Sequence, residues 1–254
     1  MKTNPKFSIV VFVLAAFSAS EIKAGDTLKA TAELVSHYVW RGSMATGSPT
    51  PNFQPTLAYG NGPIEIGLWG STDFTGSYKE VDPYVSFANG PLKLIITDYN
   101  WNFGKANYFN YKNTETGHML EGTIGFIGPS DMPVSASINT LFYGYDKKRN
   151  SSGIPDSSKQ AFSTYIELGY TKGAASFFFG FTPWASYYNN YGYSAFDSTA
   201  SKKSFSIVNI GVTISRAIKI TDSFSLPVRA TLVINPSASY TRNDYLHLVF
   251  GITF

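Results

Sequence analysis

The stretch "YLHLVFGITF", residues 245–254, decides the fold class of this chain. Its even-numbered positions are all large and apolar: Leu246, Leu248, Phe250, Ile252 and Phe254. The positions between them are mixed and mostly smaller, and include His247 and Thr253. A period of two places alternate side chains on opposite faces of a strand. The stretch therefore predicts a β-strand with one apolar face and one mixed face.

The same alternation recurs beyond Gly25, where helical periodicity is hard to find. The segments "FSTYIELGY" (162–170) and "LPVRATLVIN" (226–235) are two clear examples. Such runs, separated by turn residues, are typical of antiparallel sheets. Together they predict twelve strands, at residues 28–42, 53–60, 63–73, 80–89, 92–102, 118–127, 133–145, 162–172, 174–183, 205–216, 224–235 and 245–254.

The connections between these strands alternate between short and long. Short turns such as Asn61-Gly62 and Asn89-Gly90 follow even-numbered strands, and Asn-Gly is a strong hairpin signal. Long polar loops such as "DKKRNSSGIPDSSKQ" (146–160) follow odd-numbered strands. Tight turns on one side, long loops on the other and an even strand number are typical of transmembrane barrels. We expect an all-β fold, a transmembrane antiparallel up-and-down β-barrel of about twelve strands with both termini periplasmic.

Composition supports a surface that meets lipid outside and water inside. Only 15% of the 254 residues are charged, whereas 16% are aromatic. The absence of cysteine excludes a disulfide scaffold, a zinc ribbon and a thiol enzyme. The 20 basic and 17 acidic residues nearly balance, which argues against nucleic acid as a partner. The alternative is a secreted water-soluble β-sandwich or propeller, which would bury its apolar face against a second sheet.

The first segment predicts the compartment. Lys2 and Lys6 precede an apolar run at residues 7–17 and then small residues, which is the layout of a cleaved secretory signal. The run is too short for a membrane-spanning helix. We expect a signal peptide at residues 1–24 and a barrel at residues 25–254, located in the bacterial outer membrane.

The final Phe254 resembles the assembly signal of outer-membrane barrels. The expected partners are therefore the barrel assembly machinery, which would bind the last strand, and outer-membrane lipid.

The stretch "VSHYVWRG" (35–42) mixes a histidine, two large aromatics and an arginine. Alternation along the first strand turns Glu33, His37 and Arg41 toward the lumen. The same rule over the other strands predicts one set of pore-lining residues: Glu33, His37, Arg41, Glu65, Asp82, Glu121, Glu167, Arg229 and His247. Aromatic residues near strand ends predict an interfacial girdle: Tyr38, Trp40, Tyr170 and Phe254.

A family resemblance rests on several motifs within residues 34 to 102. These motifs are Ser36-x-Tyr38-Val39-Trp40-Arg41-Gly42, Pro51-x-x-Gln54-Pro55, Trp69-x-Ser71 and Glu80-Val81-Asp82-x-Tyr84. In their order and spacing the chain resembles the TorF-type porin family of bacterial outer-membrane proteins. The resemblance implies a porin in the outer membrane and no particular substrate. The chain departs from the family in His37 and in Pro83, and the latter predicts a bulge or a later start of the fourth strand.

Catalytic and metal-binding patterns are missing from the sequence. The three histidines are His37, His118 and His247, and none lies in a serine-nucleophile or HxxH pattern. We therefore expect no catalytic residue, metal or cofactor. The alternative of a lipid-modifying barrel enzyme would depend on His118 or His37.

Two of the long loops carry distinctive sequence patterns. The run "DKKRN" (146–150) indicates a solvated loop tip. Tyrosines beside asparagines in "ASYYNNYGYSAF" (185–196) suit a sugar or nucleoside, or belong to a plain surface loop: Tyr187, Tyr188, Tyr191 and Tyr193.

Twelve strands enclose a lumen between that of small, filled barrels and that of large aqueous porins. We therefore expect a narrow diffusion channel for small polar solutes. A structural or adhesive barrel with a plugged lumen is the main alternative.

Overall fold

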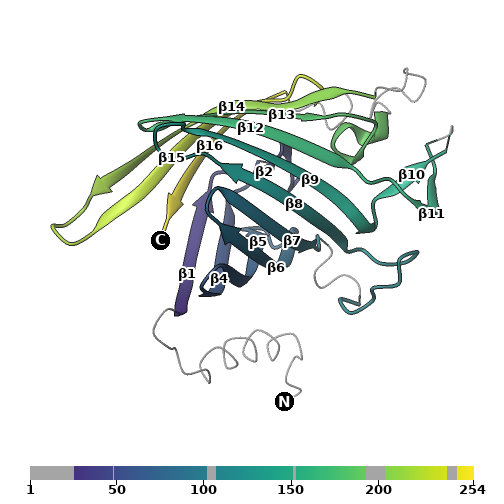
Figure 1. The fold of residues 1–254 in the computed structure, drawn as a ribbon, viewed down its shortest axis with the longest axis horizontal. Coiled ribbons are helices and arrows are strands. Elements are labelled where there is room, and N and C mark those ends of the chain that lie inside the picture. The colour runs from purple at the N-terminus through teal and green to yellow at the C-terminus, as the bar shows by residue number, and fades with distance from the viewer. Residues whose placement is uncertain (1–25, 48, 102–106, 151–152, 193–203, 239–244) are drawn as a thin grey trace, which may run out of the picture.

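The computed structural model describes residues 26–47, 49–101, 107–150, 153–192, 204–238 and 245–254, and the expected signal peptide lies outside them (Figure 1). Twelve strands form one closed barrel. Their bounds are β1 (Asp26–Val35), β4 (Asn52–Asn61), β5 (Ile64–Asp73), β6 (Lys79–Asn89), β7 (Leu92–Tyr99), β8 (Met119–Ile127), β9 (Val134–Gly144), β12 (Thr164–Lys172), β13 (Ala175–Thr182), β14 (Ser206–Lys219), β15 (Ser225–Ile234) and β16 (Leu246–Thr253).

Each barrel strand pairs antiparallel with the next along the chain, and β1 also pairs with β16. At this seam Glu33 lies opposite Thr253, and the Phe254 amide donates to the Ala32 carbonyl at 2.9 Å. Closure leaves no barrel strand with an unpaired edge. The predicted all-β, up-and-down barrel of twelve strands is confirmed.

The two ends of the barrel differ, as the connection lengths predicted. Tight turns join β4 to β5, β6 to β7 and β12 to β13, with positive φ at Gly62, Gly90 and Gly173. We call this end the short-turn rim. The opposite end, the long-loop rim, contains two small hairpins, β2–β3 (Val39–Trp40, Ser43–Met44) and β10–β11 (Lys147–Arg149, Pro155–Gln160), and the 3-10 helix η1 (Tyr187–Gly192).

The two faces of the barrel wall differ in polarity. Apolar side chains on the outer face are more than a third exposed, among them Ile66, Ile96, Ile138, Leu248 and Phe250. Polar and charged side chains lie on the inner face. This is the reverse of a water-soluble sandwich, which would cover its apolar face with a second sheet. No helix among the described residues is long and apolar enough to cross a membrane.

Two local predictions differ from the structure. The first strand ends at Val35 and does not run to Gly42, because the chain bends at Ser36 and His37 and then folds back as β2–β3. The fourth strand keeps its full length around Pro83, which pairs with Leu68 of β5. On the other side the β6–β7 ladder extends only to Tyr84, because proline has no amide to donate to β7.

Candidate functional site

The β2–β3 hairpin crosses the upper lumen inside the long-loop rim. Its turn is tight because Arg41 and Gly42 both have positive φ, 50° and 84°. At Gly42 the backbone comes so close to β14 that a Cβ would lie 1.8 Å from the Val208 carbonyl oxygen. On the other side the Asn235 amide donates to the Gly42 carbonyl at 3.0 Å. The hairpin tip is therefore held against the barrel wall.

Arg41 joins this tip to the wall of β8. Its guanidinium donates to both carboxylate oxygens of Glu121 at 2.5 and 2.8 Å. The Arg41 guanidinium also donates to the Tyr188 hydroxyl of η1 at 2.5 Å, and Tyr188 donates to Glu121 at 2.9 Å. Tyr99 of β7 adds a fourth bond to Glu121 at 3.1 Å. The Arg41 and Glu121 side chains are only 12% and 1% exposed. We call this group, Arg41 with Glu121, Tyr99 and Tyr188, the latch.

The latch keeps a charge inside the protein. Burial alone would lower the pKa of the Arg41 guanidinium, but Glu121, Tyr188 and Tyr99 raise it above its ordinary value. The guanidinium also lies 4.7 Å from the ring centroids of Trp40 and Tyr165, where cation–π attraction adds to the ion pair. Removing one partner of a buried pair costs about 3–5 kcal/mol, because the other charge stays unpaired.

Aromatic rings fill the space around the latch. Trp40 packs against Tyr99 and Trp101, with ring centroids at 5.3 and 5.6 Å. Tyr38 is buried against Trp69, at 5.5 Å. The prediction that Tyr38 and Trp40 form an outer girdle is wrong, because the segment that carries them leaves the barrel wall after Val35 and folds inward.

The other two girdle candidates lie elsewhere. Tyr170 of β12 and the terminal Phe254 are exposed. Their role at a lipid interface stays a prediction.

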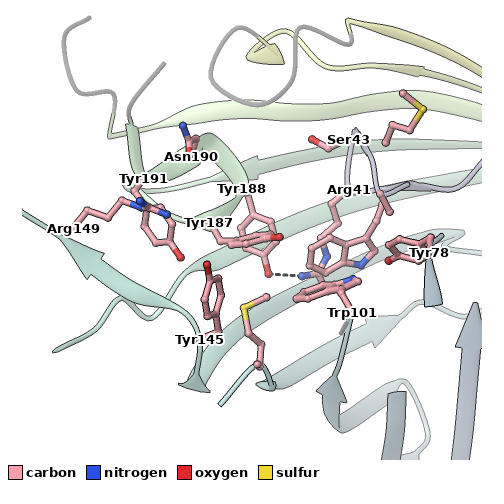
Figure 2. A pocket seen from close by; sticks show the side chains of 15 residues that line it. Arg41, Ser43, Tyr78, Trp101, Tyr145, Arg149, Tyr187, Tyr188, Asn190 and Tyr191 are labelled. Carbon is pink, nitrogen blue, oxygen red and sulfur yellow. Dashed lines mark hydrogen bonds between the residues drawn. The ribbon is translucent and has the colours of Figure 1, made fainter. Parts of the chain in front are cut away.

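A cavity of about 490 Å³ opens beside the latch, at the long-loop rim (Figure 2). We call it the rim cavity. Its walls come from β2–β3, η1, β10, the start of β8 and the loops that precede β6, β8 and β10. The described lining residues are Trp40, Arg41, Ser43, Met44, Ala45, Tyr78, Trp101, Gly117, Met119, Tyr145, Arg149, Tyr187, Tyr188, Asn190 and Tyr191.

Below the latch, the predicted inward carboxylates have partners on the inner wall. Glu33 pairs with Arg229 at 2.5 Å across Gly251, whose missing side chain leaves the space that the pair occupies. Glu65 accepts from Lys29 at 2.6 Å and from Tyr84 at 2.9 Å.

The other predicted pore-lining residues, Glu167, Asp82, His37 and His247, also have partners inside the barrel. Glu167 accepts from Tyr165 and from Asn209. Asp82 is buried and accepts from the backbone N–H of Asn100 at 3.0 Å. The rings of His37 and His247 lie 5.8 Å apart, as neighbouring first and last strands allow. Burial and the charge of His247 lower the pKa of His37.

His118, one of the two histidines on which the enzyme alternative depends, is buried just before β8 with both ring nitrogens engaged. Nδ1 lies 2.8 Å from the Asp98 carboxylate, and Nε2 lies 2.6 Å from the Tyr108 carbonyl and 2.9 Å from Asn100. These contacts leave no ring nitrogen facing a serine among the described residues. The same part of the chain holds no group of three metal-binding side chains.

Sequence reasoning missed several residues of the rim cavity. Arg149 belongs to the run interpreted as a solvated tip, yet in that run Asp146 and Lys147 are buried. Tyr187, Tyr188 and Tyr191, which the sequence suggests as binding residues, line the cavity, whereas Tyr193 lies outside the described residues. Trp101 and Tyr145 carried no signal, because an aromatic residue at a strand end looks the same whether it faces lipid or a cavity.

No protein-family model matches this chain, and no curated protein matches it. The resemblance to the TorF-type porin family therefore stays a prediction.

Proposed function

We propose that this protein is an outer-membrane channel for small polar solutes, constricted in this structure by the β2–β3 hairpin. The observation that carries the proposal is a closed barrel with an apolar outer face and a polar inner wall, crossed near one rim by a short hairpin. Lipid would surround the apolar face, and water would fill the part of the lumen that the hairpin leaves open. The short-turn rim and both termini would then be periplasmic, where the last strand meets the assembly machinery.

The lumen between the latch and the short-turn rim, the lower lumen, is lined by partly exposed charged side chains, as a passage for polar solutes would be. The Lys29 side chain is 61% exposed, and those of Arg229 and Glu33 are 31% and 22% exposed. Paired charges of both signs along a wet wall would admit polar solutes and set a modest ion preference.

A second candidate is a structural barrel that stays plugged. The buried latch favours it, because the Arg41 and Glu121 side chains are almost fully buried and lie beside a packed cluster of aromatic and aliphatic side chains. The two functions differ in whether the hairpin moves.

Single-channel recording in planar bilayers distinguishes the two candidates. We expect small or infrequent steps from the wild type and steps at least several-fold larger or more frequent from Arg41→Ala, since the hairpin would lose its two bonds to Glu121. Arg229→Ala is the matched control, because it removes a wall cation that does not touch the hairpin. Suppose that the wild type shows no conductance and that Arg41→Ala, although folded and inserted, shows none either. The plugged structural barrel is then the better description.

A further inference from the structure

We propose that the rim cavity binds a small organic anion with a flat aromatic body, of which an aromatic carboxylate is the simplest example. The inference rests on the proposed function in one respect: the anion would be a solute that the constricted channel captures at its mouth. Its binding site, however, is defined by side chains alone, and can be tested without conductance.

Ordered aromatic rings form one side of the cavity. Trp101 and Tyr187 stack nearly parallel, with centroids 5.9 Å apart and an interplanar angle of 8°. Trp40 meets Trp101 edge-on, and Tyr145 directs its hydroxyl into the same space (Figure 2). Because these rings already hold one another in place, a flat ligand would meet a preformed surface and would order few side chains on binding.

The charge of the lining is positive. Among the described residues it includes Arg41 and Arg149 and no acidic side chain. Glu121 neutralises Arg41, but no carboxylate of the described residues forms an ion pair with Arg149, whose Nη1 donates to the Gly153 carbonyl at 2.7 Å. A guanidinium has five N–H donors, so Arg149 keeps several for a ligand carboxylate.

Arg149 is positioned by the residues beneath it. Its guanidinium lies 4.7 Å from the ring centroid of Tyr191, whose hydroxyl donates to the buried Asp146 at 3.0 Å. Asn190 and Tyr191 are both held at positive φ, 49° and 55°. Two adjacent non-glycine residues in this region are strained, and such strain gathers at ligand sites where the fold imposes it.

A neutral sugar or an organic cation fits this lining less well. Sugar hydroxyls are usually bound by carboxylates, yet the part of the lining that the structure describes has none. The hydroxyls of Tyr188 and Tyr191 already donate to Glu121 and Asp146. A cation would face the unneutralised Arg149. A volume of about 490 Å³ lies within the usual range of small-molecule sites.

Isothermal calorimetry on the detergent-folded chain tests the inference, with benzoate, its neutral analogue benzamide and glucose as probes. We expect benzoate to bind at least tenfold more tightly than benzamide. Arg149→Gln should remove that preference and leave benzamide unchanged. Lys148→Gln is the matched control, because this exposed neighbour on β10 does not line the cavity and should keep the preference.

Equal affinity for benzoate and benzamide would overturn the inference, as would tighter binding of glucose or an Arg149→Gln variant that keeps the preference. Should Arg149→Gln fail to fold, Tyr145→Leu replaces it: this half-exposed ring can be removed without opening the core. Weaker binding of benzoate and benzamide alike would then support the site, and unchanged binding would overturn it.

Calorimetry and conductance separate the two proposals. Benzoate binding by a barrel that never conducts would end the channel proposal and keep the site. Conductance without benzoate binding would do the reverse.

Discussion

At the tip of the β2–β3 hairpin, Gly42 combines a positive φ with a close approach to Val208. A positive φ alone, or a close backbone contact alone, is common at glycines in turns. The combination means that the hairpin reaches the wall of β14 only because this residue has no side chain.

Gly42→Ala should therefore displace the hairpin and enlarge the channel. A Cβ there would lie 1.8 Å from a backbone oxygen, which cannot yield as a flexible side chain would. Gly76→Ala is the control, since Gly76 also has positive φ, 72°, but has nothing within 4 Å of an added Cβ. Both variants carry backbone strain of about 1–2 kcal/mol. Only Gly42→Ala should raise conductance, and equal conductance in both would contradict the assigned role.

We expect His37 to make the stability of the folded protein sensitive to pH. Burial and the neighbouring His247 lower its pKa below the ordinary 6.5, so the folded state favours the neutral ring. A group with a depressed folded-state pKa contributes stability above its unfolded pKa and loses it as the pH falls. The melting temperature in detergent should therefore fall between pH 7.5 and pH 5. His37→Gln should reduce that fall, and an identical fall in both proteins would show that another group is responsible.

At the scale of the strand, tyrosines on the inner wall lie over glycines of the neighbouring strand. A Cβ on Gly67 of β5 would lie 2.3 Å from the ring of Tyr84, and one on Gly180 of β13 would lie 2.1 Å from the Tyr165 hydroxyl. Each tyrosine also donates to a nearby carboxylate: Tyr84 to Glu65, on the strand of the glycine, and Tyr165 to Glu167, opposite the glycine. Such aromatic cover of a strand glycine helps to fix register.

Gly67→Ala should destabilise the barrel by about 1–3 kcal/mol, the usual cost of overpacking. The ring of Tyr84 would have to move and release Glu65. Gly122→Ala in β8 is the control, because its Cβ would meet only Phe142 at 3.7 Å, an ordinary contact. Urea unfolding in detergent micelles measures both, and a Gly67→Ala variant as stable as Gly122→Ala would contradict the packing argument.

At the scale of the whole molecule, closure brings charges from distant strands to one wall. Glu33 and Arg229 are 196 residues apart in sequence yet bond across β16. If this wall lines the passage, reversing one charge leaves two acidic groups side by side and biases the lumen toward cations.

Arg229→Glu should therefore shift the reversal potential in a salt gradient toward cation selectivity, and Glu33→Arg should shift it toward anions. Lys148→Glu, a change of equal charge on an exposed rim hairpin, should have a much smaller effect because solvent screens it. Unchanged selectivity in both wall variants would show that the lower lumen is not the conducting path.

Much of the barrel could be predicted from the sequence, because its signals are local. Alternation in residues 245–254 depends only on neighbouring positions, and a turn such as Asn61-Gly62 depends on two φ angles. Inward orientation of Glu33, Glu65 and Arg229 followed from the same period of two. The partners of these residues could not be predicted, because the register between two strands cannot be derived from the sequence of either strand alone.

The inner architecture of the long-loop rim was decided by tertiary structure. Residues 36–42 continue the alternation of the first strand, so the sequence indicated one longer strand with an aromatic outer edge. The chain folds inward instead because Arg41 finds Glu121, 80 residues away, and Tyr188, 147 residues away. The sequence by itself determined a twelve-stranded wall with an apolar outside. Closure of the barrel brings those distant partners within hydrogen-bonding reach of Arg41. Only this tertiary contact decided that the β2–β3 hairpin crosses the lumen near the long-loop rim, beside the rim cavity.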